Sequence, residues 1–365
     1  MPADLFAARS AVLDSFATPA LVLDEAVLDR NIAAAAASAR ERGLALRPHA
    51  KTHKSLEIAR RQLAAGAVGL TVATVSEAEV FAAGGADDLF IAYPLWLDDE
   101  RTARLRRVLE SARIRVGVDS AESAARLAAA IPGAERGALE VVVEIDSGHH
   151  RSGVLPAESG AVAAAAAGAG LDVAGVFTFP GHSYAPGARA AAARDEAEAL
   201  GAAVSALAEA GIAARVVSGG STPSVAFADA SVLTELRPGV SAIGDAQQWE
   251  LGTMGRDDIA VTVLATIVSR RGDHLIADAG SKVLSSDRGA SSTGLGRLPA
   301  HPEARITALS EHHATITGVD LPVGTRVRIA PNHVCVAVNL ADEYRVLLRD
   351  GGGASWPVDA RGRNS

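Results

Sequence analysis

Apolar runs of strand length alternate with alanine-rich stretches of helical character from about residue 44 to residue 243. This rhythm is typical of repeated β–α units around parallel strands, which are buried on both faces. The predicted strands are residues 44–48, 68–71, 89–93, 114–118, 139–145, 173–177, 214–217 and 239–243. Eight such units predict a (β/α)8 TIM-like barrel, although periodicity alone also allows an open doubly wound sheet.

After about residue 254 the pattern changes to alternating β-branched and polar residues with turns between them. The strands predicted there are residues 259–268, 274–278, 326–329 and 334–340. They indicate a separate β-rich C-terminal domain. We therefore predict an α/β protein with an N-terminal barrel over residues 25–254 and a β domain over residues 255–365.

Composition narrows the class of partner. The 365 residues include 35 Lys and Arg against 43 Asp and Glu, a net charge of −8 without a long run of like charge. This balance argues against nucleic acid or an anionic membrane as the main partner and favours a small molecule. Cys335 is the single cysteine, and neither a signal peptide nor a transmembrane stretch is recognisable. We therefore expect a cytoplasmic protein without disulfides.

A basic segment, RPHAKTHK at residues 47–54, follows an apolar strand and precedes a helix. In a barrel this position is the rim that carries active sites. Neighbouring positive charges and partial burial would disfavour the ammonium form of Lys51 and make its amine available for a Schiff base. A solvated basic loop is the alternative that the residues alone leave open.

This segment is preceded by TPALVLD at residues 18–24 and followed by GLTVATVSEAEVFAAGG at residues 69–85. Together they resemble the D-threonine aldolase and D-serine dehydratase family of fold-type III pyridoxal-phosphate enzymes. The resemblance implies that Lys51 holds pyridoxal phosphate as an internal aldimine. It also implies that residues 1–24 contribute to the β domain and that the chain forms a homodimer.

Small residues after the apolar run at 214–217 form a second candidate site. Their backbone N–H groups can converge on an anion, and hydroxyls add donors, although tight turns have the same composition. Beside a cofactor lysine, we interpret them as a phosphate site, extended by the turn at residues 238–245. The predicted cofactor contacts are Ser218, Gly219, Gly220, Ser221, Thr222, Gly244 and Asp245.

Two further loops follow predicted strands. Arg151 matches the family arginine expected near the cofactor ring, and its alternative is an exposed arginine paired with Asp146. His182 and Tyr184 put a proton carrier and a phenol at the same rim. The resemblance implies a cofactor contact for Tyr184 and a catalytic base at His182, for which a structural histidine is the alternative.

Residues 328–340 have valines at alternate positions and are interpreted as a strand. Period-two geometry would then put His333 and Cys335 on one face. Imidazole and thiolate suit zinc better than magnesium or calcium, and two ligands leave positions open for substrate. A buried cysteine beside an incidental histidine is the alternative. The resemblance implies that His333 and Cys335 are the metal pair, in the His-x-Cys form of the dehydratases. Manganese is a second candidate ion. His313 matches a family histidine whose role is open.

These features predict a lyase that uses pyridoxal phosphate and a divalent metal on a small D-β-hydroxy amino acid. Dehydration would release a 2-oxo acid and ammonia after Lys51 removes the α-proton. The alternative is a D-threonine aldolase, in which His182 takes the hydroxyl proton and glycine and an aldehyde are released. A non-catalytic pyridoxal-phosphate carrier and a racemase are less favoured, because the former lacks a second domain and the racemase tyrosine has no clear counterpart.

Overall fold

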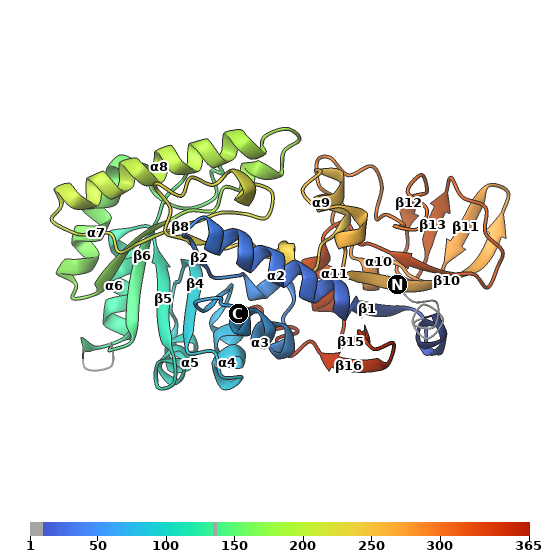
Figure 1. Ribbon diagram of the computed structural model, residues 1–365. Coiled ribbons are helices and arrows are strands. Elements are labelled where there is room, and N and C mark those ends of the chain that lie inside the picture. The colour runs from blue at the N-terminus through green and yellow to red at the C-terminus, as the bar shows by residue number, and fades with distance from the viewer. Residues whose placement is uncertain (1–9, 134–136) are drawn as a thin grey trace. The chain divides into compact units, whose positions relative to one another are not determined.

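The computed structural model describes residues 10–133 and 137–365 (Figure 1). The described chain divides into two compact units. The barrel unit consists of the described parts of Ala35–Lys51, Ala59–Gly239 and Arg363–Ser365. The sheet unit consists of the described parts of Met1–Ala34, Thr52–Ile58 and Val240–Gly362.

Eight described strands of the barrel unit are hydrogen-bonded in the order β2-β9-β8-β7-β6-β5-β4-β3, and every pair is parallel. They are β2 (Ala45–Leu46), β3 (Leu70–Val72), β4 (Asp88–Pro94), β5 (Arg113–Val118), β6 (Leu139–Glu144), β7 (Asp172–Phe177), β8 (Val216–Gly219) and β9 (Glu235–Leu236). A parallel bridge between His49 and Thr71 joins the two ends of this order. The predicted TIM-like barrel of parallel strands is confirmed.

Helices alternate with these strands along the chain (Figure 1). They are α2 (Glu25–Glu41), α3 (Leu56–Ala64), α4 (Val75–Ala83), α5 (Asp99–Leu109), α6 (Ala121–Ala130), α7 (Ser159–Gly168) and α8 (Arg189–Glu209). The side chains of Thr74, Asp98 and Ser120 cap the first turns of α4, α5 and α6. Each cap satisfies a backbone N–H that the helix leaves unpaired. No helix of the described chain is long and apolar enough to cross a membrane.

Charged side chains fill part of the barrel interior. Arg47 pairs with Glu235 at 2.7 Å and with Asp88 at 2.6 Å. The buried guanidinium of Arg237 lies 5.3 Å from the ring centroid of Phe90 and 5.2 Å from that of Phe177. Removing a charged group from water costs free energy, so these side chains need their charged and aromatic partners to remain in the barrel interior.

The eighth strand was predicted wrongly. Residues 239–243 are not a strand, because Val240–Ala242 forms a 3-10 turn. The strand in that position of the barrel is β9, which has two residues. Glu235 within β9 is buried through its ion pair with Arg47, so β9 carries no apolar run for a pattern search to detect.

The sheet unit contains a second sheet in the order β12-β13-β11-β10-β1-β15-β16, with β14 also paired to β10. Its strands are β1 (Ala20–Asp24), β10 (Val261–Arg271), β11 (His274–Ala277), β12 (Arg305–Leu309), β13 (Ala314–Thr317), β14 (Arg326–Ile329), β15 (Glu343–Leu347) and β16 (Gly353–Pro357). β1 is antiparallel to β10 and parallel to β15. Val22, Leu264 and Leu347 of these three strands form a buried cluster. The predicted β-rich second domain is thus present.

Between residues 240 and 362 the sheet unit also contains three short α-helices: α9 (Ala246–Glu250), α10 (Ser281–Leu284) and α11 (Val334–Leu340). The prediction of a strand over residues 334–340 is wrong. Val334, Ala337 and Val338 are buried at helical spacing, and the N–H of Val334 donates to Oδ2 of Asp245. Tertiary burial of this face outweighs the strand preference of alternating valines.

Candidate active site

Lys51 lies in a 3-10 turn, Ala50–Thr52, just beyond the carboxyl end of β2. Its side chain is half-buried, and its Nζ lies 6.0 Å from the ring centroid of Phe179. Positive charge is crowded around Lys51 in the segment at residues 47–54. That charge is partly offset, because Arg47 is held in ion pairs with Glu235 and Asp88.

Phe179 is the centre of a cluster of side chains in the barrel unit. The guanidinium of Arg151 lies 5.4 Å from its ring centroid, and the ring of His149 meets it edge to face at 5.5 Å. The ring of Tyr184 lies 6.4 Å away at 46°. These residues follow β2, β6 and β7, whose carboxyl ends meet at one rim of a parallel barrel. Lys51, Arg151 and Tyr184, predicted separately from the sequence, are therefore brought together around one ring.

Two of these neighbours were not predicted as site residues. Phe179 lies in the loop after β7, which contains the predicted residues His182 and Tyr184. His149 lies in the loop after β6, which contains the predicted Arg151. Burial, followed by the positive charges of Arg151 and His182, lowers the pKa of His149. The lowered pKa favours the neutral ring of His149, which offers the cluster a polar group.

His182 lies in a 3-10 turn, Gly181–Tyr184, after β7. Its Nε2 is 3.0 Å from Oδ2 of Asp195 on α8. A carboxylate only accepts, so in the neutral ring Nε2 carries the hydrogen and Nδ1 keeps its lone pair. Nδ1 is buried and has no hydrogen-bond partner among the described residues. His182 therefore has an oriented ring with an unused proton acceptor.

Asp146 does not pair with Arg151. Its Oδ2 lies 2.7 Å from Nδ1 of His150, and its Oδ1 accepts from the backbone N–H groups of Gly148 and His150. The expected pairing of Arg151 with Asp146 is therefore absent between these described residues, whereas the exposure of Arg151 agrees with that alternative. Arg151 is directed at Phe179.

The small-residue turn begins at the end of β8. Gly220 has φ +82°, a conformation that favours glycine. Its N–H donates to Oε1 of Glu196 at 2.6 Å, and the N–H of Ser221 donates to Oγ of Ser224 at 3.1 Å. These two amides, expected to face an anion, thus have protein acceptors. The hydroxyl of Ser218 donates to Glu235 at 2.7 Å, which places it in the charged interior of the barrel.

A line of buried hydroxyls continues from this turn. Oγ of Ser221 lies 2.8 Å from Oγ of Ser183 and 2.8 Å from Oγ of Ser224. Ser183 belongs to the same short turn as His182 and Tyr184. The hydroxyls connect the predicted phosphate turn with the loop around Phe179, so the two predicted parts of the cofactor site adjoin each other.

His333 and Cys335 lie at the start of α11 in the sheet unit, with His333 as its N-cap residue. Although they are not on a strand, their side chains are within hydrogen-bonding reach of each other. The negative charge of Cys335, followed by the carboxylate of Asp245, raises the pKa of His333 to about 11. Sγ of Cys335 lies 3.5 Å from Oγ1 of Thr52, the residue after Lys51 in the chain.

Asp245 was predicted as a cofactor contact, and the structure gives it other neighbours. Its fully buried carboxylate caps α9 by accepting from Gln248, and Oδ2 lies 3.3 Å from Nδ1 of His333. Gly244, with φ +67°, makes the turn that precedes it. Asp245 thus positions the predicted metal histidine, and contacts of Gly244 and Asp245 with the cofactor stay a prediction.

The side chains of His333 and Cys335 suit a divalent metal of borderline softness. They offer imidazole and thiol groups, with a carboxylate behind the imidazole to orient it. Nδ1 of His333 is buried without a well-formed hydrogen bond inside the described chain. Among the described residues, no group of three or more His, Cys, Asp or Glu side chains could hold a metal. A metal on this pair would need further ligands from water or substrate.

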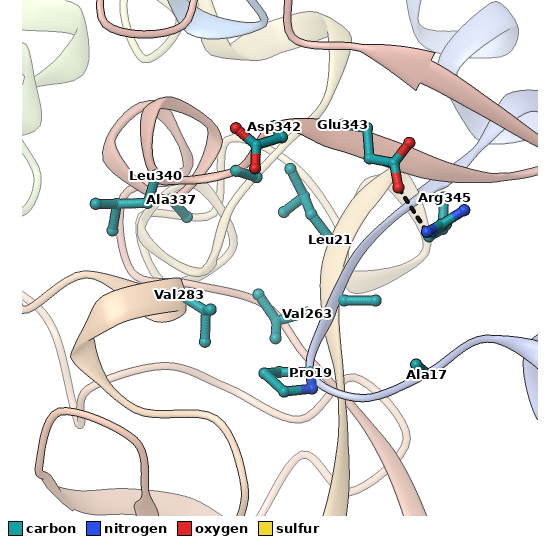
Figure 2. Close-up of a pocket in the computed structure, with 12 residues that line it drawn as sticks. Ala17, Pro19, Leu21, Val263, Val283, Ala337, Leu340, Asp342, Glu343 and Arg345 are labelled. Atoms are coloured by element: carbon teal, nitrogen blue, oxygen red, sulfur yellow. Dashed lines mark ion pairs between the residues drawn. The ribbon is translucent and has the colours of Figure 1, made fainter.

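A pocket of about 270 Å³ in the sheet unit is lined in part by Ala337 and Leu340 of α11 (Figure 2). Ala337 and Leu340 of α11, together with Val263, form its apolar wall. The ion pair between Glu343 and Arg345 lies at its edge. None of the predicted site residues lines this pocket, so we assign no part of the active site to it.

Comparison with known protein families agrees with the two units. Residues 23–247 match the family model of the alanine racemase N-terminal domain. Residues 260–347 match a domain described as "Putative serine dehydratase domain". The chain belongs to the D-threonine aldolase and D-serine dehydratase family of fold-type III pyridoxal-phosphate enzymes. The family predicted from the sequence is therefore confirmed, as is its class of pyridoxal-phosphate-dependent lyases.

Two curated relatives cover nearly the whole chain. The D-threo-3-hydroxyaspartate dehydratase of Delftia sp. (strain HT23) is 35% identical over 93% of this chain and 96% of its own length. The D-threonine aldolase of Arthrobacter sp. is also 35% identical, over 94% of this chain and 93% of its own length. This family therefore includes both reaction types at equal similarity to the chain.

The Delftia dehydratase also has a solved structure. It matches with a TM-score of 0.87 and 34% identity, over 94% of this chain and 98% of its own. Two variants of that enzyme have also been solved. One has a cysteine replaced by alanine and is in a metal-free form, and the other has a histidine two positions earlier replaced by alanine.

Proposed function

We propose that this protein is a pyridoxal-phosphate- and divalent-metal-dependent dehydratase of D-β-hydroxy amino acids. The observation that carries this proposal is the pairing of His333 with Cys335. Its His-x-Cys spacing equals that of the two residues replaced in the Delftia dehydratase, whose cysteine variant was solved in a metal-free form. We propose zinc as the metal because it accepts imidazole and thiolate ligands, with manganese as the second candidate.

Lys51 would hold the cofactor covalently through Nζ, with Arg151 and Tyr184 beside its ring. The clustering of these side chains around Phe179 supports this assignment. When bound, pyridoxal phosphate acts as an electron sink at the substrate Cα, and a divalent metal acts as a Lewis acid at the β-oxygen. The residues of the chain provide orientation and proton transfer.

In the proposed reaction the amine of Lys51 would take the α-proton of the substrate. The Cβ–O bond breaks, and the departing hydroxide leaves as water after gaining one proton. The resulting enamino acid tautomerises and reacts with one water to give a 2-oxo acid and ammonia. Loss and uptake of water balance, so the reaction consumes no oxidant or reductant.

Retro-aldol cleavage is the second candidate, and His182 favours it. Asp195 orients its ring, and the buried Nδ1 is an unused proton acceptor. A base at this position would remove the β-hydroxyl proton while the Cα–Cβ bond breaks, giving glycine and an aldehyde. The equal identity to an aldolase supports keeping this candidate.

The experiment is a parallel product assay. Protein loaded with pyridoxal phosphate and zinc, and separately with manganese, is given D-serine, D-threonine and D-threo-3-hydroxyaspartate. Ammonia with a 2-oxo acid is the expected result, and glycine with an aldehyde would establish the aldolase instead. The Lys51→Ala variant is the control, because it removes the covalent attachment of the cofactor and must abolish either activity. Absence of both product pairs with cofactor and metal bound would overturn the proposal.

A further inference from the structure

One buried acid in the barrel unit has no part in the chemistry proposed above. Glu196 lies on α8, and its side chain is 0% exposed. Oε1 accepts the N–H of Gly220 at 2.6 Å, and Oε2 has no hydrogen-bond partner among the described residues. Burying a carboxyl group with one oxygen unsatisfied costs stability, so its retention requires a compensating contact.

The contact is with the first peptide of the predicted phosphate turn. The N–H of the Gly219–Gly220 peptide donates to Glu196, and its carbonyl accepts from the backbone N–H of Arg237 at 2.8 Å. The peptide plane is therefore fixed from both sides. Because this peptide immediately precedes the positive φ of Gly220, its orientation sets the direction in which Ser221 and Thr222 leave β8.

The packing at Gly219 shows that the fit is close. A Cβ atom at this position would lie 2.4 Å from Oε1 of Glu196 and 3.0 Å from Cδ2 of Leu233. Glycine is therefore needed for the carboxyl group to reach the peptide. Glu196 and Gly219 form a matched pair, and altering either member disturbs the same contact.

We propose that Glu196 is a positioning residue for the phosphate group of the cofactor. It holds the Gly219–Gly220 peptide so that the turn that follows presents the hydroxyls of Ser221 and Thr222 to the phosphate. This inference rests on the proposed function, because it assumes that the turn receives pyridoxal phosphate. Glu196 would act through this peptide, because its side chain is buried and Oε1 accepts the N–H of Gly220.

The test compares pyridoxal phosphate with pyridoxal, which has the same ring and aldehyde but lacks the phosphate. Dissociation constants of both are measured by equilibrium dialysis on the full-length apo-protein. Glu196→Ala should weaken pyridoxal phosphate binding by about tenfold and leave pyridoxal binding within about twofold. Glu196→Gln keeps the accepting oxygen and should retain the affinity of the unaltered protein. Glu198→Ala, an exposed acid on the same helix, is the matched control and should change neither constant.

Gly219→Ala tests the same contact from the opposite side. Its added methyl group should displace the carboxyl of Glu196 and weaken pyridoxal phosphate binding selectively. This variant and Glu196→Gln keep the test decisive if Glu196→Ala does not fold. The inference would be overturned if folded Glu196→Ala or Gly219→Ala protein lost affinity for pyridoxal phosphate and pyridoxal equally. It would also be overturned if neither affinity changed. If the unaltered protein does not bind pyridoxal phosphate through Lys51, the proposed function fails before the variants are compared.

Discussion

Nε2 of His182 lies 3.0 Å from Oδ2 of Asp195, so one nitrogen of the ring is fixed as a donor and the other faces a buried space as an acceptor. The two residues come from different elements, the turn after β7 and the helix α8. A carboxylate that holds a histidine in one tautomer also stabilises its protonated form, which is the requirement for a general base.

Asp195→Ala should reduce a reaction that uses His182 as base by about tenfold or more while cofactor binding is unchanged. The measurement is kcat for glycine and aldehyde formation, alongside kcat for 2-oxo acid formation. Under the dehydratase proposal, 2-oxo acid formation slows less than glycine and aldehyde formation. Equal rates for Asp195→Ala and unaltered protein in both assays would show that this histidine is structural.

Cys335→Ala should lower the metal content of purified protein and abolish dehydration. Covalent binding of pyridoxal phosphate at Lys51 should persist, because the thiol is assigned to the metal alone. Metal content is measured by elemental analysis and cofactor attachment by absorbance. A chelator should inactivate the unaltered protein reversibly, with zinc restoring the activity. Full metal content and turnover in Cys335→Ala would contradict the assignment.

Stability should respond to pH through Glu196. Burial raises the pKa of Glu196 to about 7, above its ordinary value of 4.5. Between these values the native state binds more protons than the unfolded state, so this group lowers the free energy of unfolding as pH rises. The free energy of unfolding is measured with urea on both apo-proteins. That of Glu196→Gln should rise by about 2 kcal/mol relative to that of the unaltered protein from pH 5 to pH 8. A constant difference across this range would contradict the raised pKa.

The buried pair between Arg47 and Glu235 should be essential for folding of the barrel. Glu235→Ala leaves the guanidinium buried without one of its carboxylates and should cost about 3 to 5 kcal/mol of unfolding free energy. The exposed pair of Arg270 and Asp320 is the control, and Asp320→Ala should leave the urea midpoint nearly unchanged. Comparable losses in the two variants would show that burial does not set the strength of the pair.

The repeat of apolar strands was sufficient to predict the barrel, because seven of its strands contain the apolar runs that two-sided burial requires. It failed at β9, where Glu235 is buried by pairing with Arg47 and hydropathy carries no signal. The alternating valines of residues 334–340 failed for another reason. Local preference favoured a strand, while burial of Val334, Ala337 and Val338 together favours a helix.

Some residues of the candidate site could be predicted from the sequence, and others could not. Lys51, Arg151 and Tyr184 could be chosen from motifs, since each follows a strand and has a side chain suited to the cofactor. Phe179, around which they gather, has no chemical signature in the sequence. Glu196 was equally hidden, because an acid in the middle of a helix is normally solvent-exposed and only tertiary structure reveals its partner at Gly220.

The pairing of β1 with both β10 and β15 has a consequence for synthesis of the chain. Val22 and Leu23 of β1 are synthesised more than 200 residues before β10 and β15, the strands with which β1 pairs. The barrel strands between them pair mainly with their sequence neighbours and can assemble first. The nascent chain therefore carries β1 as an unpaired apolar strand until β10 and β15 have been made, and this is the stretch that a chaperone would protect.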